Sequence, residues 1–142
     1  MLLQSDESAH LFIETLYHYR SEGHYLLHEL VVMRDHVHLL LTPAAQTTIE
    51  RAAQLIKGGF SHRYGKLRNH RGALWQRSYH DRRIRDAEEC AAAKQYIREN
   101  PVKAGYVASP RDYSNGSASG LYELDDLPQR LKPVAKEAGT QA

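Results

Sequence analysis

Apolar side chains recur along the first third of the chain with two different spacings, which predict different elements. Between residues 6 and 22 they return every three or four positions, as in an amphipathic helix, and Gly23 would end that helix. Residues 24–33 form a nearly continuous aliphatic run that predicts a strand, and residues 36–42 predict a strand returning from it. Arg34-Asp35 would form the two-residue turn between them. The pattern therefore predicts a helix followed by a β-hairpin.

The middle of the chain predicts a second helix and a further strand. Apolar residues between positions 47 and 67 again recur with the helical period, although two adjacent glycines lower the helix propensity there. A basic loop follows at residues 68–72, and residues 74–85 combine aromatic, β-branched and charged side chains in a way that favours a strand.

The last third predicts one more helix and then a change in composition. Asp86 followed three residues later by Glu89 is typical of a capping box at a helix start. We expect the helix to end near Asn100, because Pro101 disfavours helical backbone in the residue before it. Residues 114–142 are rich in Ser, Gly, Pro and charged side chains, which predicts a mobile tail.

These elements predict an α+β fold in a single domain, residues 1–113, with the flexible tail at 114–142. A small antiparallel sheet would carry the helices on one face and a functional site on the other. The length of 142 residues and an apolar share of 42% suit one core. A single cysteine excludes an intramolecular disulfide and a thiolate zinc cluster. Since we find neither a membrane-spanning apolar run nor a signal peptide, we expect a cytoplasmic protein with no membrane partner.

Charge is distributed unevenly along this chain, although its net value is only +2. Residues 51–85 hold ten basic side chains and one acid, whereas the segments before and after this basic block are both acidic overall. Such a concentration of positive charge is typical of a site for a polyanion. The alternative is a solvated basic helix with no partner.

His36 and His38 stand two positions apart in the predicted returning strand. Side chains alternate along a strand, so both imidazoles would point to the same face, about 7 Å apart, while the aliphatic residues between and after them point to the core. Two imidazoles so placed can bind one metal ion. Imidazole nitrogens suit Mn²⁺ or Zn²⁺ better than Mg²⁺, but an added oxygen ligand widens the choice. His-x-His alone is a common pattern, so it also occurs without a metal.

Tyr96 and Asn100 stand four positions apart in the third predicted helix and therefore share a face. Cys90, Ala93 and Ile97 mark a different face, which we expect to be buried. A hydroxyl and an amide one turn apart could serve one reacting point, with Tyr96 as a nucleophile and Asn100 as an oxygen ligand. Alternatively, Tyr96 packs at the helix edge and Asn100 serves the helix C-terminus.

Three segments of the chain resemble a known family. The segment VVMRDHVHLLLTP (31–43) is similar to the histidine–hydrophobic–histidine strand of the single-tyrosine HUH transposases. The segments LWQRSYHDRRIRD (74–86) and YIRENPVKAGYV (96–107) resemble the Trp-Gln strand and the tyrosine helix of that family. The set is most similar to the REP-associated tyrosine transposases, and its order along the chain is the family's order.

The resemblance implies a fold, a reaction and the residues that perform it. The fold would be of the ferredoxin-like type seen in HUH endonucleases. The reaction would be metal-dependent cleavage and strand transfer of single-stranded DNA beside a hairpin, through a 5′-phosphotyrosine. The nucleophile would be Tyr96, and the ligands of a divalent metal, Mg²⁺ or Mn²⁺, would be His36, His38 and Asn100. DNA would lie against basic side chains, namely Arg63, Lys66, Arg68, Arg71 and Arg77.

Two departures from the family pattern bear on this interpretation. Family members usually begin with a strand ahead of the first helix, and this first strand is apparently missing here. A mis-called gene start, a truncation, or a partner chain that fills the gap in a homodimer would each account for it. The segment YSNGSASGL (113–121) matches the family's Tyr-x-x-Ser-Ser ending only loosely.

Two further functions fit parts of the same evidence. Loss of the first strand could leave a catalytically inactive protein that still binds DNA hairpins. A replication or mobilisation relaxase would share the chemistry, but relaxases usually have a third histidine in the motif and a longer chain. A covalent DNA adduct would distinguish an enzyme from a binding protein.

Overall fold

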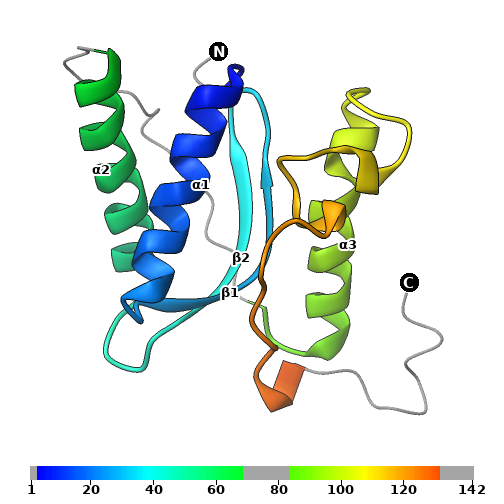
Figure 1. Ribbon diagram of the computed structural model, residues 1–142. Helices are drawn as coiled ribbons and strands as arrows, with labels where there is room; N and C mark the ends of the chain where they lie inside the picture. The colour runs from blue at the N-terminus through cyan, green and yellow to red at the C-terminus, as the bar shows by residue number, and fades with distance from the viewer. Residues whose placement is uncertain (1–2, 69–83, 132–142) are drawn as a thin grey trace. The chain divides into compact units, whose positions relative to one another are not determined.

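The computed structural model describes residues 3–68 and 84–131 (Figure 1). Within these ranges, three α-helices accompany a two-stranded antiparallel sheet, which confirms the predicted α+β class. The elements in chain order are α1 (Asp6–Ser21), β1 (Tyr25–Val32), β2 (Val37–Pro43), α2 (Ile49–Arg68), α3 (Ala87–Lys103) and three short 3₁₀ turns, η1 (Pro110–Asp112), η2 (Ser117–Ser119) and η3 (Gln129–Leu131). No helix in the described ranges is long and apolar enough to span a bilayer.

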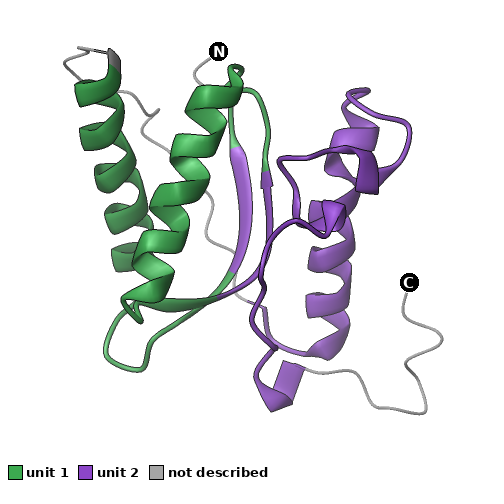
Figure 2. Cartoon of the chain, viewed as in Figure 1, with its two compact units in different colours: residues 1–26, 32–36, 41–81 green, residues 27–31, 37–40, 82–142 purple. Residues whose placement is uncertain are grey.

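The chain divides into two compact units (Figure 2). Unit 1 contains α1, α2 and the ends of the hairpin strands, as residues 1–26, 32–36 and 41–81. Unit 2 contains the middle of both hairpin strands, α3 and the three 3₁₀ turns, as residues 27–31, 37–40 and 82–142. This differs from the predicted division into a domain, 1–113, and a tail, because residues 114–131 belong to unit 2 and contact β1.

The start and end of α1 follow from local hydrogen bonds. The Ser5 hydroxyl accepts a hydrogen bond from the Ser8 amide at 3.1 Å, and Asp6 and Glu7 complement the positive end of the helix dipole. The helix stops at Ser21, one residue earlier than predicted, and Gly23 takes a positive φ of 84°. Ahead of α1, Leu3 is buried and its amide donates to the Arg34 carbonyl at 2.9 Å.

Unit 1 is held together by an apolar contact between α1 and α2, which lie side by side in Figure 1. The rings of Phe12 and Phe60 meet edge to face with their centroids 5.5 Å apart, and both side chains are fully buried. At Gly59 the helices come so close that a Cβ atom would lie 2.6 Å from the Tyr19 ring. Gly59 therefore permits the approach that the phenyl rings stabilise.

Tyr25 joins the start of β1 to α1 within the same unit. Its hydroxyl donates a hydrogen bond to the Leu16 carbonyl, and the side chain is buried. Burial, reinforced by the nearby Tyr19 and Tyr17, raises the pKa of Tyr25 well above its ordinary value. The strand is thus tied to the helix by one directional polar contact inside an apolar environment.

The turn of the hairpin lies where the sequence predicted it. The Met33 amide donates to the His36 carbonyl at 2.8 Å, so these two residues close a tip formed by Arg34 and Asp35. Strand β2 begins at Val37, however, and not at His36. The prediction that His36 is a strand residue is therefore wrong by one position, because its backbone is used to close the turn.

Helix α3 begins as predicted but ends later. Asp86 is the N-cap, and its carboxylate accepts from the Glu89 amide at 2.8 Å. The helix continues through Pro101 to Lys103, so the predicted end at Asn100 is wrong. Pro101 is buried in the last turn, where its carbonyl accepts from the Tyr106 amide at 2.9 Å. Gly105, with φ of 80°, completes this Schellman-type ending.

Residues 114–131 are packed, which corrects the prediction of a mobile tail for that range. Asn115 and Ser117 are buried, and Gly116 forms an isolated antiparallel bridge with Val31 of β1. Small residues are needed here, because a Cβ on Gly116 would lie 3.3 Å from the Val31 side chain. The Ser and Gly content that suggested mobility instead permits close contact with a strand.

Several predictions concern residues outside the described ranges. The basic loop at 68–72 lies there except for residue 68, and so does the strand expected at 74–85 except for residues 84 and 85, which are in no strand.

Candidate active site

Helix α3 presents Tyr96 and Asn100 on one face, as the spacing predicts. Tyr96 is 49% exposed, and Asn100 one turn later is half-buried. Cys90 and Ile97 are both buried, which confirms that the apolar face of α3 is not the face that carries Tyr96 and Asn100. Ala93 is only partly buried, so it lies at the edge of that face. Burial raises the pKa of the Cys90 thiol, which suits an unreactive packing residue.

The side chain of His38, on β2, lies against Tyr96. The two ring centroids are 5.3 Å apart and the planes are inclined by 83°, an edge-to-face contact. Lys103 approaches the same tyrosine, with its ammonium 5.6 Å from the ring centroid. A histidine predicted as a metal ligand and the predicted nucleophile are therefore neighbours within unit 2, together with a cation.

His36 lies in unit 1, at the end of the hairpin turn, and its side chain is exposed. Its Nδ1 is 2.7 Å from a carboxylate oxygen of Asp35. This hydrogen bond is the main reason that the pKa of Asp35 lies below its ordinary value. Because a carboxylate only accepts, Nδ1 must be the donor, so Nε2 is the nitrogen that carries the lone pair in the neutral ring. Asp35 thus orients His36, a role that the sequence reasoning missed.

The donor set predicted for a metal consists of two imidazoles and an amide oxygen. Among residues 3–68 and 84–131, no group of three or more His, Cys, Asp and Glu side chains is placed to hold a metal ion. Asn100 is not one of these four residue types, so the predicted set stays a prediction. The chemistry of the set suits a divalent ion, since the tautomer of His36 is fixed by Asp35 in the way that metal-binding histidines commonly are.

The basic residues predicted to contact DNA fall into two groups. Arg63 and Lys66 lie on α2; Lys66 is exposed, whereas Arg63 donates from Nη1 to the Thr15 hydroxyl at 3.2 Å. Arg68 is the last residue of α2, and Arg71 and Arg77 lie outside the described residues. The structure therefore gives Arg63 a contact within unit 1 that the sequence did not suggest.

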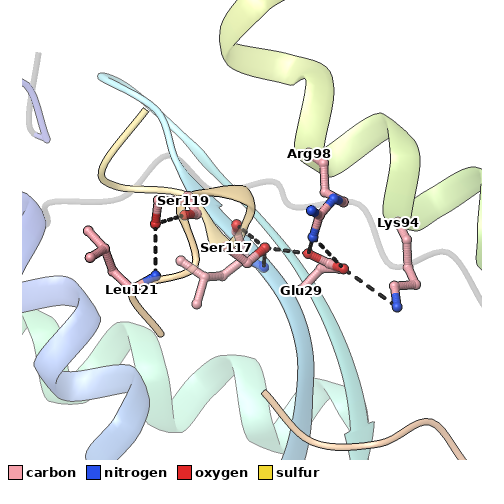
Figure 3. A network of polar contacts seen from close by, with 8 residues as sticks. Glu29, Lys94, Arg98, Ser117, Ser119 and Leu121 are labelled. Carbon is pink, nitrogen blue, oxygen red and sulfur yellow. Dashed lines mark hydrogen bonds and ion pairs between the residues drawn. The ribbon is translucent and has the colours of Figure 1, made fainter. Parts of the chain in front are cut away.

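A buried carboxylate in unit 2 was also missed. Glu29 lies in the middle of β1, is 1% exposed and contacts Lys94 and Arg98 of α3 as well as Ser117 (Figure 3). The sequence does contain a sign of it, since an acid in the largely apolar sequence of β1 needs a partner once the strand is buried. What the sequence could not supply was the identity of partners some 65 to 88 residues away.

Comparison with known proteins places the chain in a family. The sequence profile described as transposase IS200-like matches residues 3–100, a range that contains His36, His38, Tyr96 and Asn100. The chain belongs to the IS200-like transposase family.

One protein that the chain is similar to is the REP-associated tyrosine transposase of Escherichia coli strain K12. The two sequences are 31% identical over 101 residues, which is 67% of this chain and 58% of the relative. The match thus spans somewhat more than half the length of that protein. The predicted resemblance to the REP-associated branch is confirmed.

A solved structure has the same fold. It is a REP-associated tyrosine transposase bound to a REP hairpin, with a TM-score of 0.66, 22% sequence identity, and coverage of 88% of this chain and 76% of the other. The structural likeness extends over more of the chain than the family profile does. Residues beyond 100, including the packed segment with Ser117, are thus outside the profile match.

Proposed function

We propose that this protein cleaves and rejoins single-stranded DNA beside a hairpin, with Tyr96 as the nucleophile. The observation that carries the proposal is the contact of Tyr96 with His38, which puts an exposed phenol beside an imidazole within one unit. Family membership and the two relatives, a REP-associated tyrosine transposase and one bound to a REP hairpin, support this substrate class.

The proposed step is a displacement at phosphorus. The Tyr96 oxygen attacks the scissile phosphodiester, the bond from phosphorus to the 3′ oxygen breaks, and the product is a 5′-phosphotyrosine with a free 3′ hydroxyl. A phenol has an ordinary pKa of about 10, so its proton must pass to a base as the bond forms, and the departing 3′ oxygen takes up a proton. Strand transfer is the reverse reaction with another 3′ hydroxyl, so no external energy source is needed.

His36, His38 and Asn100 would hold a divalent ion, Mg²⁺ or Mn²⁺. When bound there, such an ion would polarise the phosphodiester and offset the charge that develops on its oxygens. The protein's own contribution is to orient the imidazoles, as Asp35 does for His36, and to hold the phenol beside His38.

The basic block at 51–85 would bind the DNA backbone. Lys66 is exposed on α2 and is available to a phosphate. Contacts of this kind position DNA and weaken as salt rises, without choosing a sequence. A homodimer also stays a prediction for this protein.

The decisive experiment compares Tyr96→Phe with the parent on a fluorescent single-stranded hairpin with Mg²⁺ or Mn²⁺. The parent should form a covalent adduct on a denaturing gel, and peptide mapping should place the nucleotide on the peptide with Tyr96. Tyr96→Phe should bind the hairpin as the parent does, but the adduct should vanish and cleavage should fall by several orders of magnitude.

Tyr106→Phe is the matched control, because this tyrosine follows the same helix and its ring contacts Tyr113, 5.8 Å away between centroids, outside the predicted site. It should form the adduct at the parent's rate. Undiminished cleavage by Tyr96→Phe, or an adduct on another tyrosine, would contradict the mechanism. Tight hairpin binding by the parent with no adduct would favour the inactive hairpin-binding protein.

A further inference from the structure

Glu29 is the most deeply buried acid in the described part of the chain, with 1% of its surface exposed. Figure 3 shows its carboxylate between α3 and the segment that contains Ser117. Arg98 Nη1 lies 3.4 Å and 3.5 Å from the two carboxylate oxygens, Lys94 Nζ lies 3.6 Å from one, and the Ser117 hydroxyl donates to the other. An unpaired carboxylate in this place would be costly, so these three contacts are what permits an acid here.

The two cations come from one flank of α3. At about 100° per residue, Lys94 and Arg98 point within about 40° of each other around the helix axis. Tyr96 and Asn100 form a second pair, directed about 160° away from the first. The buried residues Cys90, Ile97 and Pro101 lie between the two pairs.

This arrangement fixes the rotation of α3 about its own axis. Apolar contacts on the middle face are not directional, so by themselves they tolerate a small roll of the helix. Polar contacts on one flank resist such a roll, because their hydrogen-bond and ion-pair geometry is lost when Lys94 and Arg98 move away from Glu29. A roll that released them would also carry Tyr96, on the other flank, away from His38.

We propose that Glu29 is a positioning residue for Tyr96: through Lys94, Arg98 and Ser117 it sets the rotation of α3, and thereby the direction in which the tyrosine faces. The effect on the reaction rests on the proposed function of Tyr96, whereas the effect on orientation does not. Ser117 connects this group of contacts to the backbone of β1, since its oxygen also accepts from the Leu30 amide at 3.1 Å.

The orientation can be measured without any reaction. In the parent labelled in its His and Tyr rings, the edge-to-face contact should give NOEs between His38 and Tyr96 ring protons. Glu29→Gln keeps the size of the side chain and removes its charge. We expect those NOEs to weaken by at least half in this variant, and the single-turnover rate of adduct formation to fall at least about tenfold, since a misplacement of 1 Å can cost a hundredfold.

Hairpin affinity separates positioning from structure. Glu29→Gln should bind hairpin DNA within about threefold of the parent, because the basic block is not part of the Glu29 contacts. Arg98→Gln provides a second variant: its side chain is 43% exposed, so it removes one contact without burying a new group, and it should change both readouts in the same direction but less. Glu89→Gln is the control, since Glu89 lies on α3 but pairs with Arg85, just ahead of the helix, and its replacement should change neither readout.

Unchanged NOEs together with an unchanged rate in Glu29→Gln would overturn the proposal. So would a parallel loss of thermal stability, hairpin affinity and rate, which would show that Glu29 only supports the fold. If the parent forms no adduct with any hairpin, the proposed function fails, but the His38–Tyr96 NOEs still decide whether Glu29 orients Tyr96.

Discussion

Within each of the two units of the protein, a different kind of contact joins the elements. In unit 1, α1 meets α2 through buried rings and aliphatic side chains, with Phe12 and Phe60 in the middle. Unit 2 also buries apolar residues, but segments far apart in its sequence are joined by polar contacts. Glu29 contacts Lys94, Arg98 and Ser117, while Asp125 contacts the strand at Leu27 and His28.

Apolar and polar contacts differ in how strongly they fix the orientation of the elements that they join. Apolar burial contributes most of the free energy of folding but specifies direction poorly. Polar contacts contribute less net free energy, yet they fix orientation, because a buried group that loses its partner is penalised. In the unit that contains Tyr96, directional contacts of Glu29 and Asp125 join segments that are far apart in the sequence, and such contacts suit a site whose geometry must be fixed.

The largest expected effect is a loss of stability on removal of the ring contact in unit 1. Phe60→Ala removes a fully buried ring and leaves a cavity beside Phe12, so the free energy of unfolding should fall by about 3–5 kcal/mol. Denaturant unfolding monitored by circular dichroism would measure it. Phe60→Leu is the control and should cost clearly less. A loss below 1 kcal/mol for Phe60→Ala would mean that the ring contact does not hold unit 1 together.

A smaller effect is expected from the polar contacts of unit 2. The Asp125 carboxylate accepts from the Leu27 amide at 2.8 Å. Asp125→Ala leaves that buried amide without its acceptor and should lower the free energy of unfolding by about 1–3 kcal/mol. Asp125→Asn keeps an acceptor oxygen and should cost less than half as much. The neighbouring exposed residue provides a matched control, since Asp126→Ala should stay within about 0.5 kcal/mol of the parent.

The smallest effect compares two adjacent glycines of α2. A Cβ at Gly58 meets nothing within 4 Å, so Gly58→Ala should stabilise the protein by up to about 1 kcal/mol through helix propensity. Gly59→Ala should be at least about 1 kcal/mol less stable than Gly58→Ala, because its methyl group would displace the Tyr19 ring. In a Tyr19→Ala background the two alanines should become equivalent. Equal stability in the parent background would show that the close approach at Gly59 carries no cost.

The sequence predicted those elements whose signals are local. Gly23 ends α1 within one residue of the expected position, and Asp86 caps α3 through the hydrogen bond that its spacing with Glu89 suggested. The sequence also predicted correctly that Tyr96 lies off the buried face of α3, since this follows from helical periodicity alone.

Predictions failed where distant residues decide the outcome. Pro101 does not end α3, because its burial and the Tyr106 amide on its carbonyl stabilise one more turn. The composition around Gly116 and Ser117 suggested mobility, yet small size is what allows those residues to contact β1. The partners of Glu29 could not be read from local spacing, because periodicity carries no information on contacts across dozens of residues.

The separation between Glu29 and Ser117 has a consequence for synthesis on the ribosome. Chains grow at about 5–20 residues per second, so the roughly fifty residues between the end of α2 and Ser117 take on the order of 2–10 seconds to add. During that time Phe12 of α1 and Phe60 of α2 can already come into contact, whereas Glu29 of β1 does not yet have all its partners. A polypeptide released early would therefore keep its phenyl contact but present no oriented tyrosine.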